Sequence, residues 1–138
     1  MIRSILTVLV GLIAGSVTVF ALEWVGHRIQ PPPAGLDLQN MEALKAYVST
    51  APPVVFVLLL AAWAGGGFVG GLVAAMLAAR KRVAHALAVG SIQTILAVVQ
   101  LVMIPHPIWV AVVGVLCFVP FAWFSGRLVG DPLPTPTV

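Results

Sequence analysis

The chain has 138 residues, of which 61% are hydrophobic and only 8% are charged. A soluble domain has roughly 25% charged residues, so this composition excludes an ordinary soluble domain and indicates a protein whose solvent is lipid. The formal net charge of +3 does not indicate a nucleic-acid partner, because the basic residues do not form one face with interleaved aromatic residues.

Long stretches without Asp, Glu, Lys or Arg mark the membrane spans. These stretches lie between Arg3 and Glu23, between Lys45 and Arg80, and between Arg82 and Arg127. A bilayer core needs about 20 helical residues, so the first two stretches hold one span each. The third holds two spans, because Pro105 and Pro107 remove backbone donors and break the helix between them.

We therefore predict an all-α fold, an integral membrane bundle of four helices. The helices are expected over residues 4–27, 53–79, 84–104 and 108–129. With an external loop, 28–52, they make a single transmembrane domain, 1–130, which is followed by a disordered Pro-rich tail, 131–138. The first span is expected to remain uncleaved, because its apolar run exceeds the 7–15 residues typical of a signal peptide.

The positions of Lys and Arg predict the orientation in the membrane. Cytoplasmic loops carry an excess of positive charge. With four spans, the segment "RKR" at 80–82 lies on the same side as Arg3 and Arg127, whereas only Arg28 and Lys45 lie on the other side. Both termini are therefore predicted to be cytoplasmic.

The external loop has its own helical pattern. It opens with an extended "PPP" at 31–33, and Asp37 is a candidate N-cap for the helix that follows. Apolar residues then recur at helical spacing: Leu38, Met41, Leu44, Tyr47 and Val48. The pattern predicts a short amphipathic helix that either lies on the membrane surface or packs across the mouth of the bundle.

The span 53–79 is rich in glycine and alanine. It matches G-x-G-x-x-G in form, but a dinucleotide site needs a βαβ unit, which this sequence does not predict. Small residues instead recur every four positions, with Gly66 and Gly70 in one row and Gly67 and Gly71 in the next. In lipid, such rows let helix backbones approach closely. They predict packing against two neighbours, and they permit a homo-oligomer or a larger membrane complex without requiring one.

A few polar residues interrupt the spans on defined faces. Glu23 and His27 share a face of the first span with Ser16, and Gln93 and Gln100 share a face of the third. Intramembrane acids usually face the protein interior. If the faces converge, a polar path runs from the outer surface to about mid-depth. The candidate binding residues are Glu23, His27, Gln93, Gln100 and His106.

These residues leave three interpretations open. Glu23 and His27 can be a structural pair that ends a helix and anchors the loop, or they can form a binding or proton-handling site, since imidazole titrates near neutral pH. A third possibility is a zinc or iron site formed by Glu23, His27 and His106, although three scattered ligands make no tight motif. No catalytic residue is predicted, because Cys117 has no evident base partner.

The corresponding functions belong to different classes. The first is a non-enzymatic accessory, scaffold or assembly protein whose partners are membrane lipid and other membrane proteins. The second is a small transporter or proton-coupled binder, which with only four spans would need an oligomer. The third is a membrane metalloprotein. The pattern itself specifies no cofactor.

Three motifs also resemble a family of small, uncharacterised bacterial membrane proteins. They are E-x-x-G-H at 23–27, "PPPAGLD" at 31–37 and "MIPHPIW" at 103–109, and the resemblance covers nearly the whole chain except the tail. It implies a four-span architecture and a multi-pass location in the bacterial cytoplasmic membrane. It implies no activity, substrate or functional residue.

Overall fold

The computed structural model describes residues 2–37 and 39–130. Within these residues the fold is all-helical, with five helices: α1 (Ile2–Ile29), α2 (Met41–Thr50), α3 (Pro53–Leu77), α4 (Arg82–Met103) and α5 (Ile108–Val129). All except α2 are long and apolar enough to cross a membrane, which confirms the expectation of four such helices. The predicted tail, 131–138, and Leu38 of the predicted loop helix lie outside the described residues.

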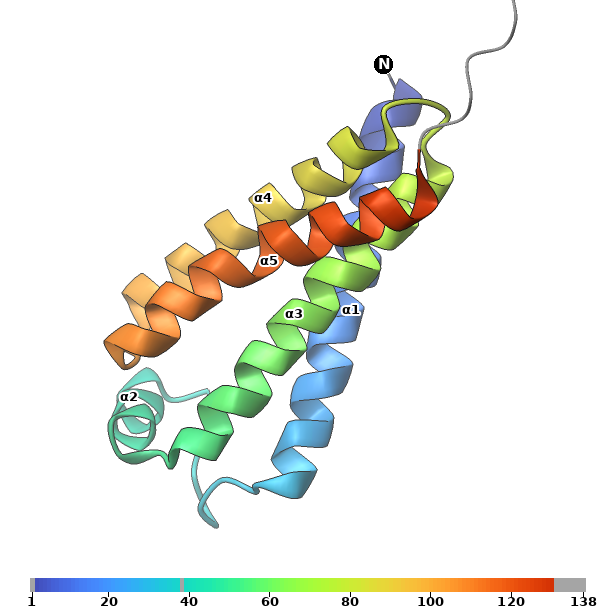
Figure 1. Ribbon diagram of the computed structural model, residues 1–138. Coiled ribbons are helices and arrows are strands. Elements are labelled where there is room, and N and C mark those ends of the chain that lie inside the picture. Colours follow the sequence, from blue (N-terminus) through green and yellow to red (C-terminus); the bar gives the residue numbers. More distant parts are fainter. Residues whose placement is uncertain (1, 38, 131–138) are drawn as a thin grey trace, which may run out of the picture.

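The long helices form two pairs that meet at an angle. In Figure 1, α1 runs beside α3, and α4 runs beside α5. The two pairs are joined through α3, which also packs against α5 and α4. The pairs separate toward the end of the molecule where α2 lies, and the start of α1, the α3–α4 connection and the end of α5 meet at the other end (Figure 1).

Proline and asparagine residues set several helix starts. Pro53 is the first residue of α3, where its missing N–H costs nothing, and Pro107 is the N-cap of α5. The N-cap of α2 is Asn40, whose Oδ1 accepts hydrogen bonds from the backbone N–H groups of Glu42 (3.1 Å) and Ala43 (3.2 Å). The prediction that Asp37 caps this helix was wrong, because its carboxylate accepts from Gln39 N–H at 2.9 Å in a local turn.

The first row of small residues on α3 faces α1. A Cβ at Gly15 would lie 2.8 Å from the carbonyl oxygen of Gly66, and a Cβ at Gly11 would lie 2.8 Å from that of Gly70. The two backbones therefore approach too closely for any side chain between them. Such contact supplies dense van der Waals packing in lipid, where the hydrophobic effect does not drive helices together.

The second row faces α5. A Cβ at Gly67 would lie 2.9 Å from the carbonyl oxygen of Phe118, and one at Gly71 would lie 2.8 Å from Ala122 Cα. Both rows are thus occupied by neighbours within the same chain.

Helix α1 meets α4 at a single crossing. A Cβ at Gly11 would lie 3.0 Å from Val89 Cγ2, and a Cβ at Gly15 would clash with Gln93 Nε2. Cavities lie between the two helices on either side of this crossing, one toward α2 and one toward the opposite end. The crossing therefore separates the space between α1 and α4 into two parts.

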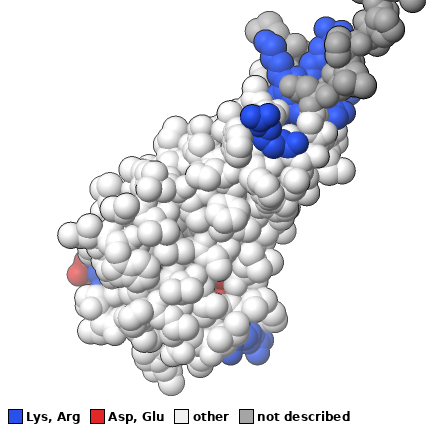
Figure 2. Space-filling model, in the orientation of Figure 1, with Lys and Arg blue, Asp and Glu red and all other residues white. Residues whose placement is uncertain are grey.

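The two ends of the bundle differ in charge. Figure 2 shows Lys and Arg gathered at the end opposite α2. We call it the basic end, and the chain brings to it Arg3, Arg80, Lys81, Arg82 and Arg127. Each end also has an arginine over a tryptophan ring, with Arg28 4.7 Å from the Trp24 centroid and Arg127 5.1 Å from that of Trp123. Such pairs are typical of the two membrane–water interfaces.

Candidate functional site

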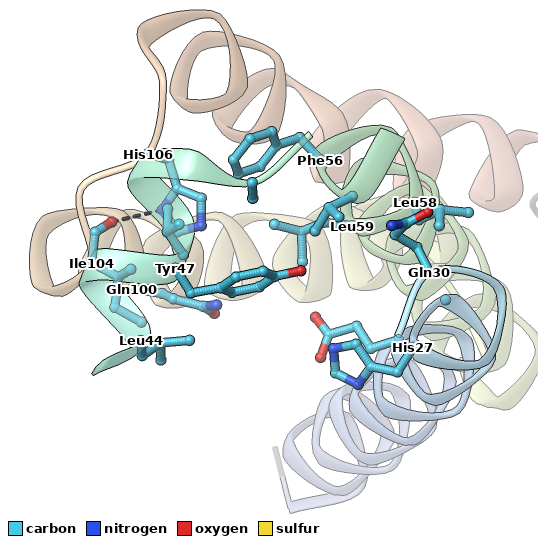
Figure 3. Close-up of a pocket in the computed structure, with 15 residues that line it drawn as sticks. His27, Gln30, Leu44, Tyr47, Phe56, Leu58, Leu59, Gln100, Ile104 and His106 are labelled. Atoms are coloured by element: carbon cyan, nitrogen blue, oxygen red, sulfur yellow. Dashed lines mark hydrogen bonds between the residues drawn. The ribbon is translucent and has the colours of Figure 1, made fainter. Parts of the chain in front are cut away.

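The space between the two helix pairs contains a cavity of about 250 Å³ at the end where α2 lies. We call it the outer cavity. Its polar lining comes from α1 and the residue after it, from α2, from α4 and from the α4–α5 hairpin, and consists of Glu23, His27, Gln30, Tyr47, Gln100 and His106. Figure 3 shows Tyr47 extending between Gln100 on one side and His27 on the other. Four of the five predicted binding residues thus line one cavity.

A second cavity, of about 230 Å³, adjoins it at greater depth between α1 and α4. We call it the inner cavity. It is lined by Ser16 and Gln93, and it shares Glu23 and Gln100 with the outer cavity. The fifth predicted binding residue, Gln93, therefore lies in the inner cavity, at its deep end near the α1–α4 crossing.

Helix α2 covers the outer cavity. Its Leu44, Tyr47 and Val48 all line the cavity, and Val48 is only 8% exposed because it packs in a core cluster with Phe56 and Leu60 of α3. Helix α2 thus contributes a phenol to the outer cavity.

Glu23 is the half-buried residue on which both cavities meet. Its carboxylate interacts electrostatically with His27 one turn later, and the side chain of Trp63 lines the inner cavity with it. Trp63 is only 2% exposed and lies in the middle of α3. An indole N–H is a donor only, so it suits a carboxylate acceptor.

Gln93 has an unusual environment. Its side chain is only 5% exposed, and its Oε1 is buried without a hydrogen-bond partner among the described residues. Its Nε2 lies against the backbone of Gly15. An unpaired buried oxygen costs about 1–3 kcal/mol, so this oxygen reduces the stability of the fold by about that amount.

His106 is held by its hairpin. Its Nδ1 lies 2.6 Å from the carbonyl oxygen of Ile104, and because a carbonyl only accepts, Nδ1 carries the proton. The ring stacks edge-on against Phe56 with centroids 6.0 Å apart. The hydrogen bond to Ile104 fixes the tautomer of His106 and leaves its Nε2 free to accept a hydrogen bond or to bind a ligand.

The predicted metal ligands do not form a cluster. Across residues 2–37 and 39–130, no group of three His, Cys, Asp or Glu side chains lies close enough to hold a metal ion. The set Glu23, His27 and His106 therefore fails geometrically: the three line a common cavity, yet they are too dispersed to share one ion.

Sequence reasoning missed three residues of the site. The sequence pattern assigns Tyr47 only to the apolar face of the loop helix, whereas its side chain lines the outer cavity with Gln30. Trp63 had no assigned role, although a tryptophan at mid-span lies away from both interfaces where this residue is usually found. The mid-span position of Trp63 was therefore the feature of the sequence that could have assigned this residue to the site.

The four apolar helices indicate a multi-pass membrane protein. In comparisons with protein families, curated proteins and solved structures, no match to the chain was found.

Proposed function

We propose that the protein binds a small organic cation in the outer and inner cavities and exchanges it for protons. One observation carries this proposal: the two cavities adjoin and share Glu23 and Gln100. Together they run from the mouth covered by α2 to Gln93 near the α1–α4 crossing. The outer cavity alone has room for roughly eight water molecules at about 30 Å³ each, enough for a compact amine or guanidine.

The charges favour a cation over an anion. Glu23 is the acidic residue of both cavities, and within the described part of the chain neither cavity is lined by Lys or Arg. Aromatic rings lie beside it, with Tyr47 and Phe56 in the outer cavity and Trp63 in the inner one. A carboxylate among aromatic faces attracts ammonium or guanidinium groups, whereas it repels an anion.

The imidazoles supply the coupling to protons. His27 is exposed in the outer cavity, and His106 offers Nε2 there. An imidazole can bind and release a proton, so cation entry can be balanced by proton release to the adjacent solution. An accessory or scaffold role, the main alternative, accounts for the glycine packing but does not explain why the protein has two polar cavities.

The orientation follows from the charge asymmetry. We place the basic end in the cytoplasm and the outer cavity at the external face of a bacterial cytoplasmic membrane, because positive charge is retained inside. A reporter fused after Val138 is then expected to read as cytoplasmic and one inserted at Gly35 as external. Transport with four spans per chain further implies an oligomer.

The test of binding uses protein in zwitterionic nanodiscs and titration calorimetry. Tetramethylammonium and guanidinium serve as cation probes, and acetate serves as the anion probe. The parent is expected to bind at least one cation and not acetate. Glu23→Gln, which removes the charge at constant shape, is expected to weaken binding by about tenfold or more.

Glu42→Gln is the matched control. Glu42 belongs to α2, is 88% exposed and pairs with Lys45 at 3.8 Å, but it does not line either cavity. Its variant should bind as the parent does. Equal cation affinities of the parent and Glu23→Gln, or no cation binding at all, would contradict the proposal and favour the accessory role instead. In proteoliposomes, His27→Ala should slow cation-driven proton flux.

A further inference from the structure

A third space lies on the other side of the α1–α4 crossing, toward the basic end. It is a groove of about 450 Å³ between α1 and α4. Its walls are apolar side chains of α1, such as Val8 and Leu12, and the small side chains Ala84 and Ala88 of α4. It shares no residue with the outer or inner cavity. The groove is therefore separate from the proposed cation site.

The length of the groove corresponds to one leaflet of a bilayer. From Lys81 at one end to Ile92 at the other, a helix rises about 16 Å. Half of the hydrocarbon core is about 15 Å thick. The groove ends at the α1–α4 crossing, where Gln93 lies against Gly15. A lipid acyl chain fits this length, whereas a partner helix that spans both leaflets would meet the closed crossing.

The open end of the groove is basic. Lys81 and His85 line it, and Arg3 precedes Ser4, which lines it as well. His85 Nδ1 donates to the carbonyl oxygen of Lys81 at 3.0 Å, which leaves Nε2 for a ligand. In the described part of the chain, no acidic residue lines the groove. Figure 2 shows positive charge concentrated at this end of the molecule.

We propose that the groove binds one anionic phospholipid. The acyl chain lies along Val8, Leu12 and Ala88, and the phosphate lies at Lys81 and His85. Basic pockets between membrane helices bind anionic headgroups in this way, because the ammonium group neutralises the phosphate at the surface where the chain enters the hydrocarbon core.

Native mass spectrometry of delipidated protein tests the proposal. The probes are phosphatidylglycerol and phosphatidylcholine with identical acyl chains, added in equal amounts. The parent is expected to retain phosphatidylglycerol in preference to phosphatidylcholine, with one molecule per chain. The same spectra give the oligomeric state.

Two variants test the two halves of the site. Lys81 has a left-handed backbone (φ 52°), which asparagine tolerates, so Lys81→Asn removes the charge without disturbing the turn. It should reduce the preference by about fivefold. Ala84→Phe fills the groove without changing a charge and should reduce the binding of both lipids.

Arg127→Gln is the matched control for charge. Arg127 lies at the same basic end, but it packs over Trp123 on α5 and does not line the groove. This variant should keep the full preference. The proposal is overturned if the parent shows no preference, if Arg127→Gln loses as much as Lys81→Asn, or if a dimer covers the groove and excludes lipid.

Discussion

The contact between α1 and α3 predicts opposite effects for the same substitution at two positions of one helix. At Gly15, a Cβ would lie 2.8 Å from the carbonyl oxygen of Gly66 and would clash with Gln93 Nε2. The glutamine end can swing away, but the Gly66 carbonyl belongs to the backbone of α3 and cannot. Gly15→Ala must therefore push the two helices apart.

The size of the effect follows from two opposing contributions. Overpacking a close contact costs about 1–3 kcal/mol, while alanine recovers about 0.5–1 kcal/mol over glycine in a helix. Gly15→Ala should thus destabilise the protein by about 1–2 kcal/mol. Gly26→Ala should stabilise it by about 0.5–1 kcal/mol, because its Cβ would meet Leu58 Cβ at an ordinary 3.5 Å.

Reversible unfolding in mixed micelles, followed by helical circular dichroism and tryptophan fluorescence, measures both values. The comparison is internal, since both glycines are buried residues of α1. If the two variants have the same free energy of unfolding, or if Gly26→Ala is the less stable, the close approach of α1 to α3 is not what holds these helices together.

Three further predictions concern single side chains. Gln93→Met removes the unpaired buried oxygen and should raise stability by about 1 kcal/mol; a loss of stability would show that the oxygen is paired. Cys117 is only 9% exposed, and its Sγ–H donates a hydrogen bond to the carbonyl oxygen of Leu60 at 3.6 Å. It should therefore react with a water-soluble maleimide at least roughly tenfold more slowly in the folded protein than in denatured protein, and equal rates would contradict its burial. Asn40→Ala should lower the local stability of α2 by about 1 kcal/mol and speed the amide hydrogen exchange of α2 about fivefold, while exchange in the long helices stays unchanged. An equal acceleration of exchange in all helices would refute a local capping role.

The spans were predictable because charge is costly in hydrocarbon. The apolar stretch after Pro107 gave the bounds of α5, Ile108–Val129, correctly. The start of α4 was placed two residues late and the end of α3 two residues late, because hydropathy reports membrane depth and not where backbone hydrogen bonds stop. For the same reason α1 begins at Ile2 and ends at Ile29, outside the predicted 4–27.

The cavities were only half predictable. Helix periodicity placed Glu23 with His27, and Gln93 with Gln100, on single faces of their helices. It could not specify which helices are neighbours, and that depends on glycine contacts between segments far apart in the chain, such as Gly15 with Gly66. Nor could it place Tyr47 over the cavity, because the packing of α2 depends on Val48 entering the core of the long helices.

The α1–α4 crossing decides what the described arrangement can and cannot do. The two polar cavities lie on one side of Gly15 and Gln93, and the basic groove lies on the other. Under the proposed function, a cation would bind from the end where α2 lies, and its passage to the basic end would require α1 to separate from α4. Gln93, which lies at this crossing, also carries the only buried side-chain nitrogen or oxygen without a hydrogen-bond partner in the described residues, so the crossing combines the closest α1–α4 contact with an unsatisfied polar atom.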